Sequence, residues 1–468
     1  MKLHKLKKIV LNTKNHKDRI ILAELYANLM IGNPEKVYGD IHFENKLISS
    51  FLFLIPHINI NIKSPSKSIC HIISTPYLEG GHTRLCENLA SMEGKNKNLL
   101  ITRNTKINVL DRLKKHFTKI SIISDENFIE RIKKITTYLY NFKKIILHIH
   151  PDDILTIIAI GILKKIKKDL TVYFVNHADH IFSYGRSVTD LMFLISYRGY
   201  EIEHLNEDRS YALSFLGIPI NTKEKPLFKN EIKTILIAGS SYKMKPNSSY
   251  SIQKEINKYF KSNNNLKLIV IGAKITDFWW WKIKLMYWPH IKIYDLLPYS
   301  NYIDILKKCD ACIDTAPSTG GTAFAEMYLN GLRPLAIYSG VYGYTPLDCI
   351  RGNSLQESEK KGYILLDDIY DQLVLVHGKE NVQHRYHDGL NFNCHGIPSS
   401  LCKLNNDLDM YISSKKKTIS LGLIKDIIGL KEVKKIEKLN ILINNISFLN
   451  SFSIYLSKTI SLFLNTKK

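Results

Sequence analysis

Short runs of Ile, Leu and Val alternate with longer amphipathic stretches from about residue 66 onward. This alternation is typical of βαβ units, in which helices connect buried parallel strands. Helices are therefore expected between the apolar runs, for example over Glu126–Tyr140. The first series of predicted strands comprises His71–Thr75, Asn98–Arg103, Lys119–Asp125, Lys144–His150 and Thr171–His177, with a sixth near Tyr200–Leu205.

A second series of apolar runs begins after Pro219–Lys233, a polar segment with two prolines that is typical of a linker. Two successive sets of parallel strands predict an α/β fold with two Rossmann-like domains. Open parallel sheets bind ligands at the carboxyl ends of their strands, so the loops after these strands are the expected functional sites. The second series of predicted strands comprises Thr234–Ser240, Leu266–Ala273, His290–Leu297, Ala311–Ala316 and Pro334–Ser339.

These patterns divide the chain into four predicted regions. Residues 1–65 form a polar, basic lead-in, 66–222 the first Rossmann-like domain and 230–350 the second. Residues 351–468 form a mostly helical region, whose segment Ile441–Leu464 mixes Ile, Leu and Phe with Ser and Asn. That segment is either a helix packed on the core or a helix lying on a membrane. Lysines in this region, including 415–417, suit contact with an anionic membrane.

The composition is that of a globular protein with an excess of positive charge. The 468 residues are 45% hydrophobic and 23% charged, which fits two or three domains and argues against disorder. The formal net charge of +23 comes mostly from lysines spread along the chain. No RNP-like, zinc-finger or helix-turn-helix signature accompanies it, so nucleic acid is not a predicted partner. A phosphate-bearing substrate or an anionic membrane fits a basic enzyme equally well.

Targeting and cysteine patterns point to the cytoplasm. The N-terminus is basic but lacks the apolar core of a signal peptide, and no apolar run reaches the roughly 18 residues of a membrane-spanning helix. The seven cysteines are irregularly spaced, and Cys309 and Cys312 have no second pair to complete a metal site. Reduced thiols are the simpler interpretation. We therefore expect a cytoplasmic protein, with peripheral contact to the inner face of the membrane as an option.

The loop after the first strand of the second domain carries residues suited to a diphosphate. Gly239-Ser240-Ser241 allows the backbone to approach an anion, and Ser241 is a predicted ligand. Lys243 then adds a positive charge. In a chain this rich in lysine, a solvated surface residue is the structural alternative for Lys243.

A second loop of the same domain joins a strand to a helix. Gly320 and Gly321 keep side chains away from the helix N-terminus, where free N–H groups form an anion site that includes Thr322 and Ala323. Glu326 lies about one turn into this helix, where its carboxylate is suited to two ribose hydroxyls. The structural alternative for Glu326 is a favourable charge near a helix N-terminus.

The first domain has a similar glycine loop after its first strand. Gly80 and Gly81 open a helix, and His82 follows with a pKa range suited to proton transfer near neutrality. His82 is predicted to act as a base toward the acceptor or as a donor to sugar or phosphate. Arg84 is predicted to assist substrate binding. A locally bonded His at a helix start, and an Arg that covers the helix surface, are the structural alternatives.

A cluster of polar side chains ends the fifth predicted strand. An Asp-oriented His is expected there, with His177 and Asp179 in catalytic roles and Asn176 and His180 at the substrate. Two His and one Asp in five residues also invite a metal ion, but no third and fourth ligands are evident, and no metal is predicted. Trp279-Trp280-Trp281 is expected on a helix away from the strand ends, in a core or interface role.

Together these motifs resemble the donor half of GT-B glycosyltransferases, and in particular glycosyltransferase family 41, which includes the O-linked N-acetylglucosamine transferases and bacterial protein N-glucosyltransferases. In that family a Tyr-Lys-x-x-Pro-like segment holds the donor diphosphate through its Lys, and Tyr242–Pro246 matches it. A Thr-rich loop with Gly and a ribose-binding acid follow there, matched by 314–322 and Glu326. A Gly-x-His segment places a His beside the transferred sugar, matched by Gly80-Gly81-His82.

One position departs from other GT-B families, which carry two Glu eight positions apart in this loop. Glu326 corresponds to the second of these, but Ser318 stands where the first would be. The departure favours the family-41-like interpretation and argues against a two-Glu retaining mechanism. The resemblance covers roughly residues 66–345.

The resemblance implies a GT-B architecture, with two Rossmann-like domains facing a central cleft and a helical C-terminal tail. It implies a bacterial, hexosyltransferase-like enzyme of polysaccharide biosynthesis that moves a sugar from a nucleotide diphosphate sugar, expected to be a UDP-sugar. The acceptor would be a cell-surface glycan, a lipid-linked molecule or a protein, no cofactor would be required, and inversion is favoured. The rival functions are a nucleotide-sugar epimerase of the same architecture and a non-catalytic protein that binds polyanions or membranes.

Overall fold

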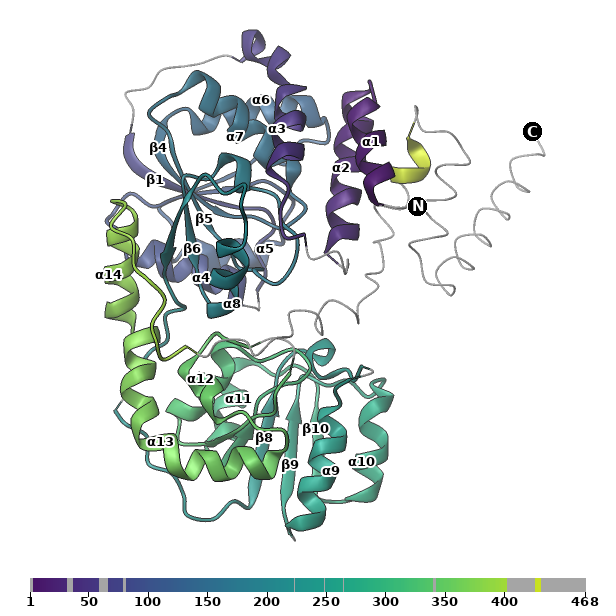
Figure 1. Cartoon of the computed structure of the whole chain (residues 1–468), viewed down its shortest axis with the longest axis vertical. Helices are drawn as coiled ribbons and strands as arrows, with labels where there is room; N and C mark the ends of the chain where they lie inside the picture. The colour runs from purple at the N-terminus through teal and green to yellow at the C-terminus, as the bar shows by residue number, and fades with distance from the viewer. Residues whose placement is uncertain are drawn as a thin grey trace, which may run out of the picture. The chain divides into compact units, whose positions relative to one another are not determined.

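The computed structural model describes residues 3–31, 37–58, 66–78, 81–222, 224–247, 249–263, 265–339, 342–401 and 426–430 (Figure 1). These residues form two compact units. The first contains the chain up to Met192, together with Asp208–Tyr211 and residues 426–430. The second contains Phe193–Glu207 and the chain from Ala212 to residue 401.

A seven-stranded sheet has the order β3-β2-β1-β4-β5-β6-β7. Neighbouring strands from β3 to β5 pair in parallel, which confirms the five strands predicted in this region. The strands are β1 (Ser66–Ile73), β2 (Asn98–Ile101), β3 (Lys119–Ile122), β4 (Phe142–His148), β5 (Thr171–Val175), β6 (Leu191–Leu194) and β7 (Ala212–Phe215).

The strand predicted near 200–205 is wrong, because that segment belongs to helix α8 (Tyr197–His204). Ser196 caps this helix, since its hydroxyl accepts a hydrogen bond from the Gly199 N–H at 2.9 Å. Buried Ile202 lies on the inner side of α8. The apolar residues here therefore follow a helical pattern, and the sixth strand lies earlier, at β6.

Helices surround the first sheet, and one of them is buried along most of its length. Every residue of α7 (Ile154–Ile166) from Ile154 to Leu163 is buried. Gly161 allows another helix to pass close by, because a Cβ there would lie 2.6 Å from the Ile48 side chain. The other helices of this unit are α4 (Gly81–Ser91), α5 (Ile107–Leu113), α6 (Phe128–Leu139) and the short η2 (Arg186–Val188).

The basic N-terminal residues are helical and belong to the core of the first unit. They form α1 (Leu3–Asn12), α2 (His16–Met30), α3 (Ile41–Ser49) and η1 (Leu52–His57). Helix α3 packs against α7, and α1 packs against α2 (Figure 1). The many lysines of this segment make it read as polar in the sequence, but its helices have an apolar face, which includes the buried residues Ile20, Leu22 and Phe43.

The second unit contains a parallel five-stranded sheet with the order β10-β9-β8-β11-β12. All five strands predicted for this unit are confirmed. Successive residues of β8 enter different core clusters, Ile235 and Ile237 on one face and Leu236 on the other. The sheet is thus buried on both faces, as in doubly wound folds. The strands are β8 (Thr234–Ala238), β9 (Lys267–Ile271), β10 (Ile291–Tyr294), β11 (Ala311–Ile313) and β12 (Arg333–Leu335).

The helices of the second unit connect these strands and follow them. Together the two units confirm the predicted α/β fold of two Rossmann-like parallel sheets. The connecting elements are η3 (Ser241–Met244), α9 (Ile252–Ser262), η4 (Phe278–Trp280), α10 (Trp281–Met286), α11 (Tyr299–Leu306) and α12 (Thr322–Leu329). After β12 come η5 (Pro346–Ile350), α13 (Leu355–His377) and α14 (Lys379–Gly389).

Within the described residues, no helix combines the length and apolar character needed to cross a membrane. The predicted packed or membrane-lying helix at Ile441–Leu464 lies outside the described residues, as do lysines 415–417.

Candidate functional site

The end of β8 and the end of β9 approach each other closely in the second unit. Gly272 has a φ of +92°, and a Cβ at this position would lie 2.1 Å from the carbonyl oxygen of Gly239. A Cβ on Gly239 would in turn lie 2.9 Å from a methyl carbon of Thr315, which follows β11. Glycine is therefore required at two strand ends, and it brings the backbone of Gly239–Lys243 against the loop after β11.

Lys243 and the loop after β11 are held together in both directions. The Lys243 ammonium donates to the Thr319 carbonyl oxygen at 3.0 Å. The Ser318 N–H donates to the Lys243 carbonyl oxygen at 3.2 Å. Burial lowers the pKa of Lys243, and nearby Asp314 acts against this change. The structure thus brings together the two predicted donor-binding loops, with a partly desolvated cation where they meet.

The glycines of this loop expose the start of α12. The Gly320 N–H donates to a carboxylate oxygen of Asp314 at 2.6 Å, and a Cβ on Gly320 would lie 2.8 Å from that oxygen. Gly321 is the residue before the helix, with a φ of +62° and open space where a Cβ would be. The Ala323 N–H turns toward the Gly320 carbonyl oxygen at 3.4 Å. Thr322, Ala323 and the predicted ribose ligand Glu326 are all half-buried.

Two hydroxyls of this loop were not predicted as site residues. Ser318 and Thr319 are each only 6% exposed. Their hydroxyl oxygens have no hydrogen-bond partner among the described residues. A buried polar group without a partner costs about 1–3 kcal/mol, so these hydroxyls mark a place where a ligand or water is expected. The sequence signal was the run of small hydroxyl residues directly before Gly320.

Ser241, which is predicted to bind the donor, has a hydrogen-bond partner within the protein. Its hydroxyl donates to an Asp277 carboxylate oxygen at 2.6 Å. The same oxygen accepts the Lys274 N–H at 2.7 Å. Ser241 therefore joins the loop after β8 to the loop after β9, and its part in donor binding stays a prediction.

A buried network of charged side chains holds the loop after β11, the predicted donor loop. Arg351 pairs with the carboxylates of Asp314 and Asp348, and all three side chains are 1% exposed. Asp348 also accepts the N–H groups of Gly343 and Tyr344 at 2.8 and 3.1 Å. Burial raises the pKa of Asp314, and Arg351 opposes that rise. Because Asp314 holds the Gly320 N–H, this network fixes the shape of the loop.

Histidines from three neighbouring strands meet in the first unit. Nδ1 of His71, on β1, lies 3.0 Å from Nε2 of His148, at the end of β4. Nδ1 of His148 lies 2.9 Å from Nε2 of His177, which follows β5. These contacts form a chain of hydrogen bonds, and at its other end the Glu93 carboxylate lies 2.8 Å from Nε2 of His71. His71 and Glu93 are not among the predicted site residues, because no local pattern joins two positions that are 22 residues apart.

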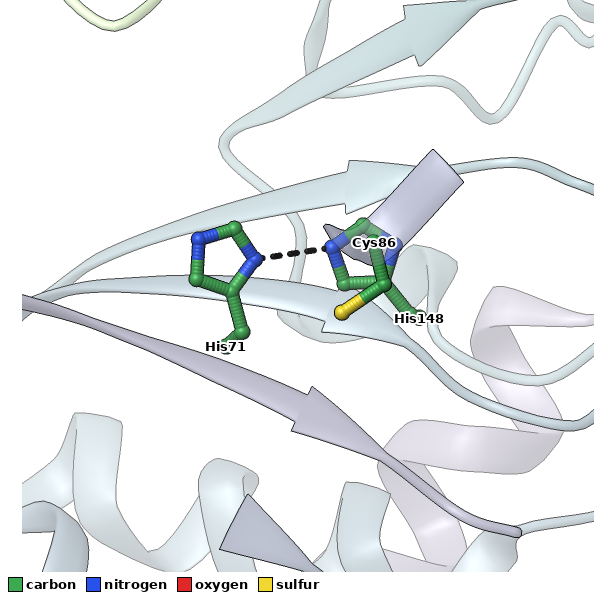
Figure 2. Close-up of side chains that lie close together, drawn as sticks. All are labelled: His71, Cys86 and His148. Atoms are coloured by element: carbon green, nitrogen blue, oxygen red, sulfur yellow. Dashed lines mark hydrogen bonds between the residues drawn. The ribbon is translucent and has the colours of Figure 1, made fainter. Parts of the chain in front are cut away.

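Cys86, on α4, lies beside the first two rings of this chain, as Figure 2 shows. Its sulfur and the ring nitrogens of His71 and His148 all lie within 4.8 Å of one another, and all three residues are buried. The two rings meet edge to edge, with 17° between their planes and 5.2 Å between their centres. Each nitrogen therefore points at the other ring.

His82 lies in the first turn of α4 and borders the same cluster. Its Nε2 donates to the His148 carbonyl oxygen at 2.8 Å, and its ring centre lies 4.6 Å from that of His177. Burial, and then His150, lower the pKa of His82 to about 4, although the bond to the carbonyl acts against them. Burial also lowers the pKa of His148 and of His177. These three imidazoles are therefore neutral at neutral pH.

The remaining predicted residues of the first unit lie around this cluster. Asn176 and Asp179 are buried, and the Asp179 carboxylate lies 3.5 Å from Nδ1 of His180. Asp179 thus faces His180, whereas the hydrogen bond of His177 joins it to His148. Gly81 begins α4, Arg84 is exposed on this helix, and Gly80 lies outside the described residues.

Comparison with known proteins shows the fold. No protein-family model matches the sequence, and no curated protein matches it. Alr3699/HepE of Anabaena, in complex with UDP and glucose, is similar with a TM-score of 0.51 and 11% identity over 69% of this chain and 99% of that one. The lipopolysaccharide outer core galactosyltransferase WaaB, in its apo form, has a TM-score of 0.50 and 13% identity over 69% and 99%.

A mutant of the Thermobaculum terrenum O-GlcNAc transferase has a TM-score of 0.49 and 10% identity over 83% of this chain and 79% of that one. At these identities the likenesses concern the fold alone. The likenesses to Alr3699/HepE and WaaB confirm the GT-B architecture. The resemblance to family 41 stays a prediction.

Proposed function

We propose that this chain is a glycosyltransferase that moves a sugar from a UDP-sugar to a hydroxyl or amide of its acceptor. One observation carries the proposal. Lys243 and the unpaired hydroxyls of Ser318 and Thr319 gather beside the open N-terminus of α12. This set combines one cation, two neutral donors and the positive end of a helix dipole, which suits a diphosphate.

The remaining donor contacts follow from the positions of the same elements. Glu326, one turn into α12, would accept hydrogen bonds from the ribose hydroxyls. UDP is favoured as the nucleotide because the similar Anabaena protein is in complex with UDP and glucose. Lys243 and the α12 N–H groups would stabilise the charge that develops on the leaving diphosphate, so the proposed reaction requires no cofactor.

The histidines of the first unit would serve the acceptor. A neutral imidazole at neutral pH can take the proton of an attacking hydroxyl. The acceptor oxygen forms a bond to the anomeric carbon while the bond from that carbon to the diphosphate oxygen breaks, and UDP leaves with the electron pair. The proton goes to His177 or to His82. The family resemblance favours inversion at the anomeric carbon.

Product analysis tests this function against the epimerase alternative. The protein is incubated with UDP-sugars, with and without candidate glycan, lipid-linked and protein acceptors. A transferase forms a glycosylated product and free UDP when the acceptor is present, and only slow hydrolysis occurs without it. An epimerase would convert the UDP-sugar without any acceptor. Interconversion of UDP-sugars in the absence of acceptor would therefore contradict the proposal.

We further propose peripheral contact with an anionic membrane, through an apolar face on η4 and α10. Phe278, Leu285 and Trp288 are 68%, 74% and 69% exposed. Phe278 and Trp281 meet edge to face with 5.2 Å between ring centres, and Trp281 donates to the Ile275 carbonyl oxygen at 2.8 Å. The opposite side of the same segment, with Trp280 and Ile283, is buried. The segment is thus apolar on both sides.

The charges around this face indicate the kind of partner. Residues 278–294 contain no Asp or Glu but include Lys282, Lys284 and Lys292. Exposed Trp and Phe beside lysines are typical of segments that lie in the headgroup region of an anionic bilayer. Such contact would bring the enzyme to a lipid-linked acceptor at the cytoplasmic face of the membrane.

Sedimentation with vesicles tests this contact. Vesicles with phosphatidylserine should pellet the protein at low salt, and added salt should weaken the binding. The double variant Leu285→Glu/Phe278→Glu should abolish pelleting, whereas the control Leu227→Glu, at a still more exposed position outside this face, should not. Equal binding by both variants would contradict the assignment. Truncation after residue 401 separately tests the predicted contribution of the C-terminal lysines.

A further inference from the structure

Four side chains in the first unit form one continuous chain of hydrogen bonds. It runs from the Glu93 carboxylate through His71 and His148 to His177, with contacts of 2.8, 3.0 and 2.9 Å. Its two central rings are fully buried. His177 is half-buried and lies where the chain leaves the carboxyl end of β5.

The carboxylate at one end determines where every proton in the chain lies. An ionised carboxylate only accepts hydrogen bonds, so His71 must carry its proton on Nε2. Where each ring has one donor and one acceptor nitrogen, Nδ1 of His71 then accepts from Nε2–H of His148. By the same step, Nδ1 of His148 accepts from Nε2–H of His177. Nδ1 of His177 is left without a proton.

We propose that Glu93 is a positioning residue that acts through His71 and His148 to fix the tautomer of His177, presenting its Nδ1 as a proton acceptor. The carboxylate does not touch His177, so its influence passes through two buried rings. His148 is neutral, because burial lowers its pKa, so it donates from one ring nitrogen and accepts at the other. A charged ring would donate from both nitrogens and break the sequence of donors and acceptors.

This inference rests on the proposed function only for its catalytic consequence. When Nδ1 of His177 takes the proton of the acceptor hydroxyl, the ring becomes positive while it donates from Nε2 to His148. The polarised chain stabilises that charge, since each following ring directs an acceptor nitrogen toward it and the carboxylate lies at the end. The acceptor oxygen keeps the electron pair that forms the glycosidic bond.

A metal ion between His71, Cys86 and His148 is the competing explanation for the cluster. An ion would need both facing nitrogens unprotonated and directed at a common third point. The observed nitrogens face each other head-on across 3.0 Å (Figure 2). That arrangement is the geometry of a hydrogen bond, and it leaves neither of these two nitrogens directed at a common third point.

Nitrogen NMR of the full-length protein tests the inference without substrate. Histidine labelled with ¹⁵N distinguishes the Nε2–H from the Nδ1–H tautomer by chemical shift, and single His→Gln variants assign the signals. His71, His148 and His177 should all be neutral Nε2–H tautomers at pH 7. An Nδ1–H signal for His177 would overturn the proposal, as would stoichiometric zinc in the purified protein.

Two variants distinguish the specific effect of the Glu93 carboxylate from the general effect of removing a buried acid. One is on α4 and the other lies just after its C-terminal end. Glu93→Gln retains the shape but can donate as well as accept, so a mixture of tautomers should appear as far away as His177. The control Glu87→Gln removes another buried carboxylate of α4, which pairs with Arg112 outside the chain. The control should leave all three signals unchanged. An unchanged His177 signal in Glu93→Gln would overturn the proposal.

Kinetics provide the second measurement. Glu93→Gln should reduce kcat by about 10-fold or more at unchanged UDP affinity, and should move the acidic limb of the kcat profile to lower pH. A structural role would lower activity without moving that limb, and this result would contradict a positioning role. If the enzyme proves not to be a glycosyltransferase, the NMR result still decides the polarity of the chain.

Discussion

Replacement of Arg351 tests whether the buried charge network with Asp314 and Asp348 holds the predicted donor loop. Its guanidinium pairs with the carboxylates of Asp348 and Asp314 and donates to the Ile337 carbonyl oxygen at 3.0 Å, with no significant exposure to solvent. Arg351→Met would leave two buried carboxylates without a cation. Breaking a buried ion pair by removing one partner costs about 3–5 kcal/mol.

The loss should depend on pH in a defined direction. Burial raises the pKa of Asp314, and in the variant the opposing effect of Arg351 is lost, which leaves only the hydrogen bond from the Gly320 N–H against that rise. The folded variant then binds protons more tightly than the unfolded chain does, so its stability falls as pH rises through the window between the unfolded and folded pKa values. The deficit relative to the unmodified protein should therefore be smaller at pH 5 than at pH 8.

Urea unfolding followed by tryptophan fluorescence measures this deficit. All four tryptophans, 279–281 and 288, lie in the second unit, so the signal reports on that unit alone. With a slope of about 2 kcal/mol per molar urea, the midpoint should fall by about 2 M at pH 8. Arg333→Met is the matched control, because Arg333 is only half-buried and stacks on Tyr363. A loss below about 1 kcal/mol, or an equal loss at both pH values, would refute the network.

Four further predictions concern the two sites. Lys243→Ala should weaken UDP binding by about 10- to 100-fold in calorimetry, since one charged contact contributes about 1.5–3 kcal/mol, whereas exposed Lys245→Ala should not. Burial lowers the pKa of Lys243, so UDP affinity should begin to fall at a lower pH than an ordinary lysine would allow. His82→Ala should reduce kcat by about 10²- to 10⁴-fold at unchanged UDP affinity, and a near-native rate would make His82 structural. Gly320→Ala should weaken UDP binding without unfolding the protein, because its Cβ would lie 2.8 Å from Asp314, and unchanged affinity would show that the loop tolerates the methyl group.

The sequence predicts the two sheets well because their central strands are short apolar runs buried on both faces. The β8 segment, with Ile235, Leu236 and Ile237 all buried, gives the same signal whichever face each residue enters. The glycine loops are likewise visible, because close backbone approach restricts the residue type. Lys243 and Gly320 are near strand ends, and the fold alone brings such loops together.

Other features depend on distance along the chain or on register. Arg351 reaches Asp314 across 37 positions, and His71 meets His148 across 77, so no local pattern reveals either pair. The N-terminal helices are not predicted, because their many lysines give residues 1–65 the pattern of a polar segment. The Trp279-Trp280-Trp281 motif predicts a core or an interface, and the structure divides it, with Trp280 buried and Trp281 exposed.

The central claim is that the second unit binds a nucleotide sugar at Lys243 and the start of α12. A thermal-shift screen of nucleotides and nucleotide sugars tests it most directly. Tryptophan fluorescence is the signal that is monitored, because it reports on this unit. A ligand at 100 times its Kd stabilises the folded state by about 2.7 kcal/mol. UDP and at least one UDP-sugar should raise the unfolding temperature, and the shift should disappear in Lys243→Ala. If no nucleotide or nucleotide sugar stabilises the unmodified protein, the claim is contradicted.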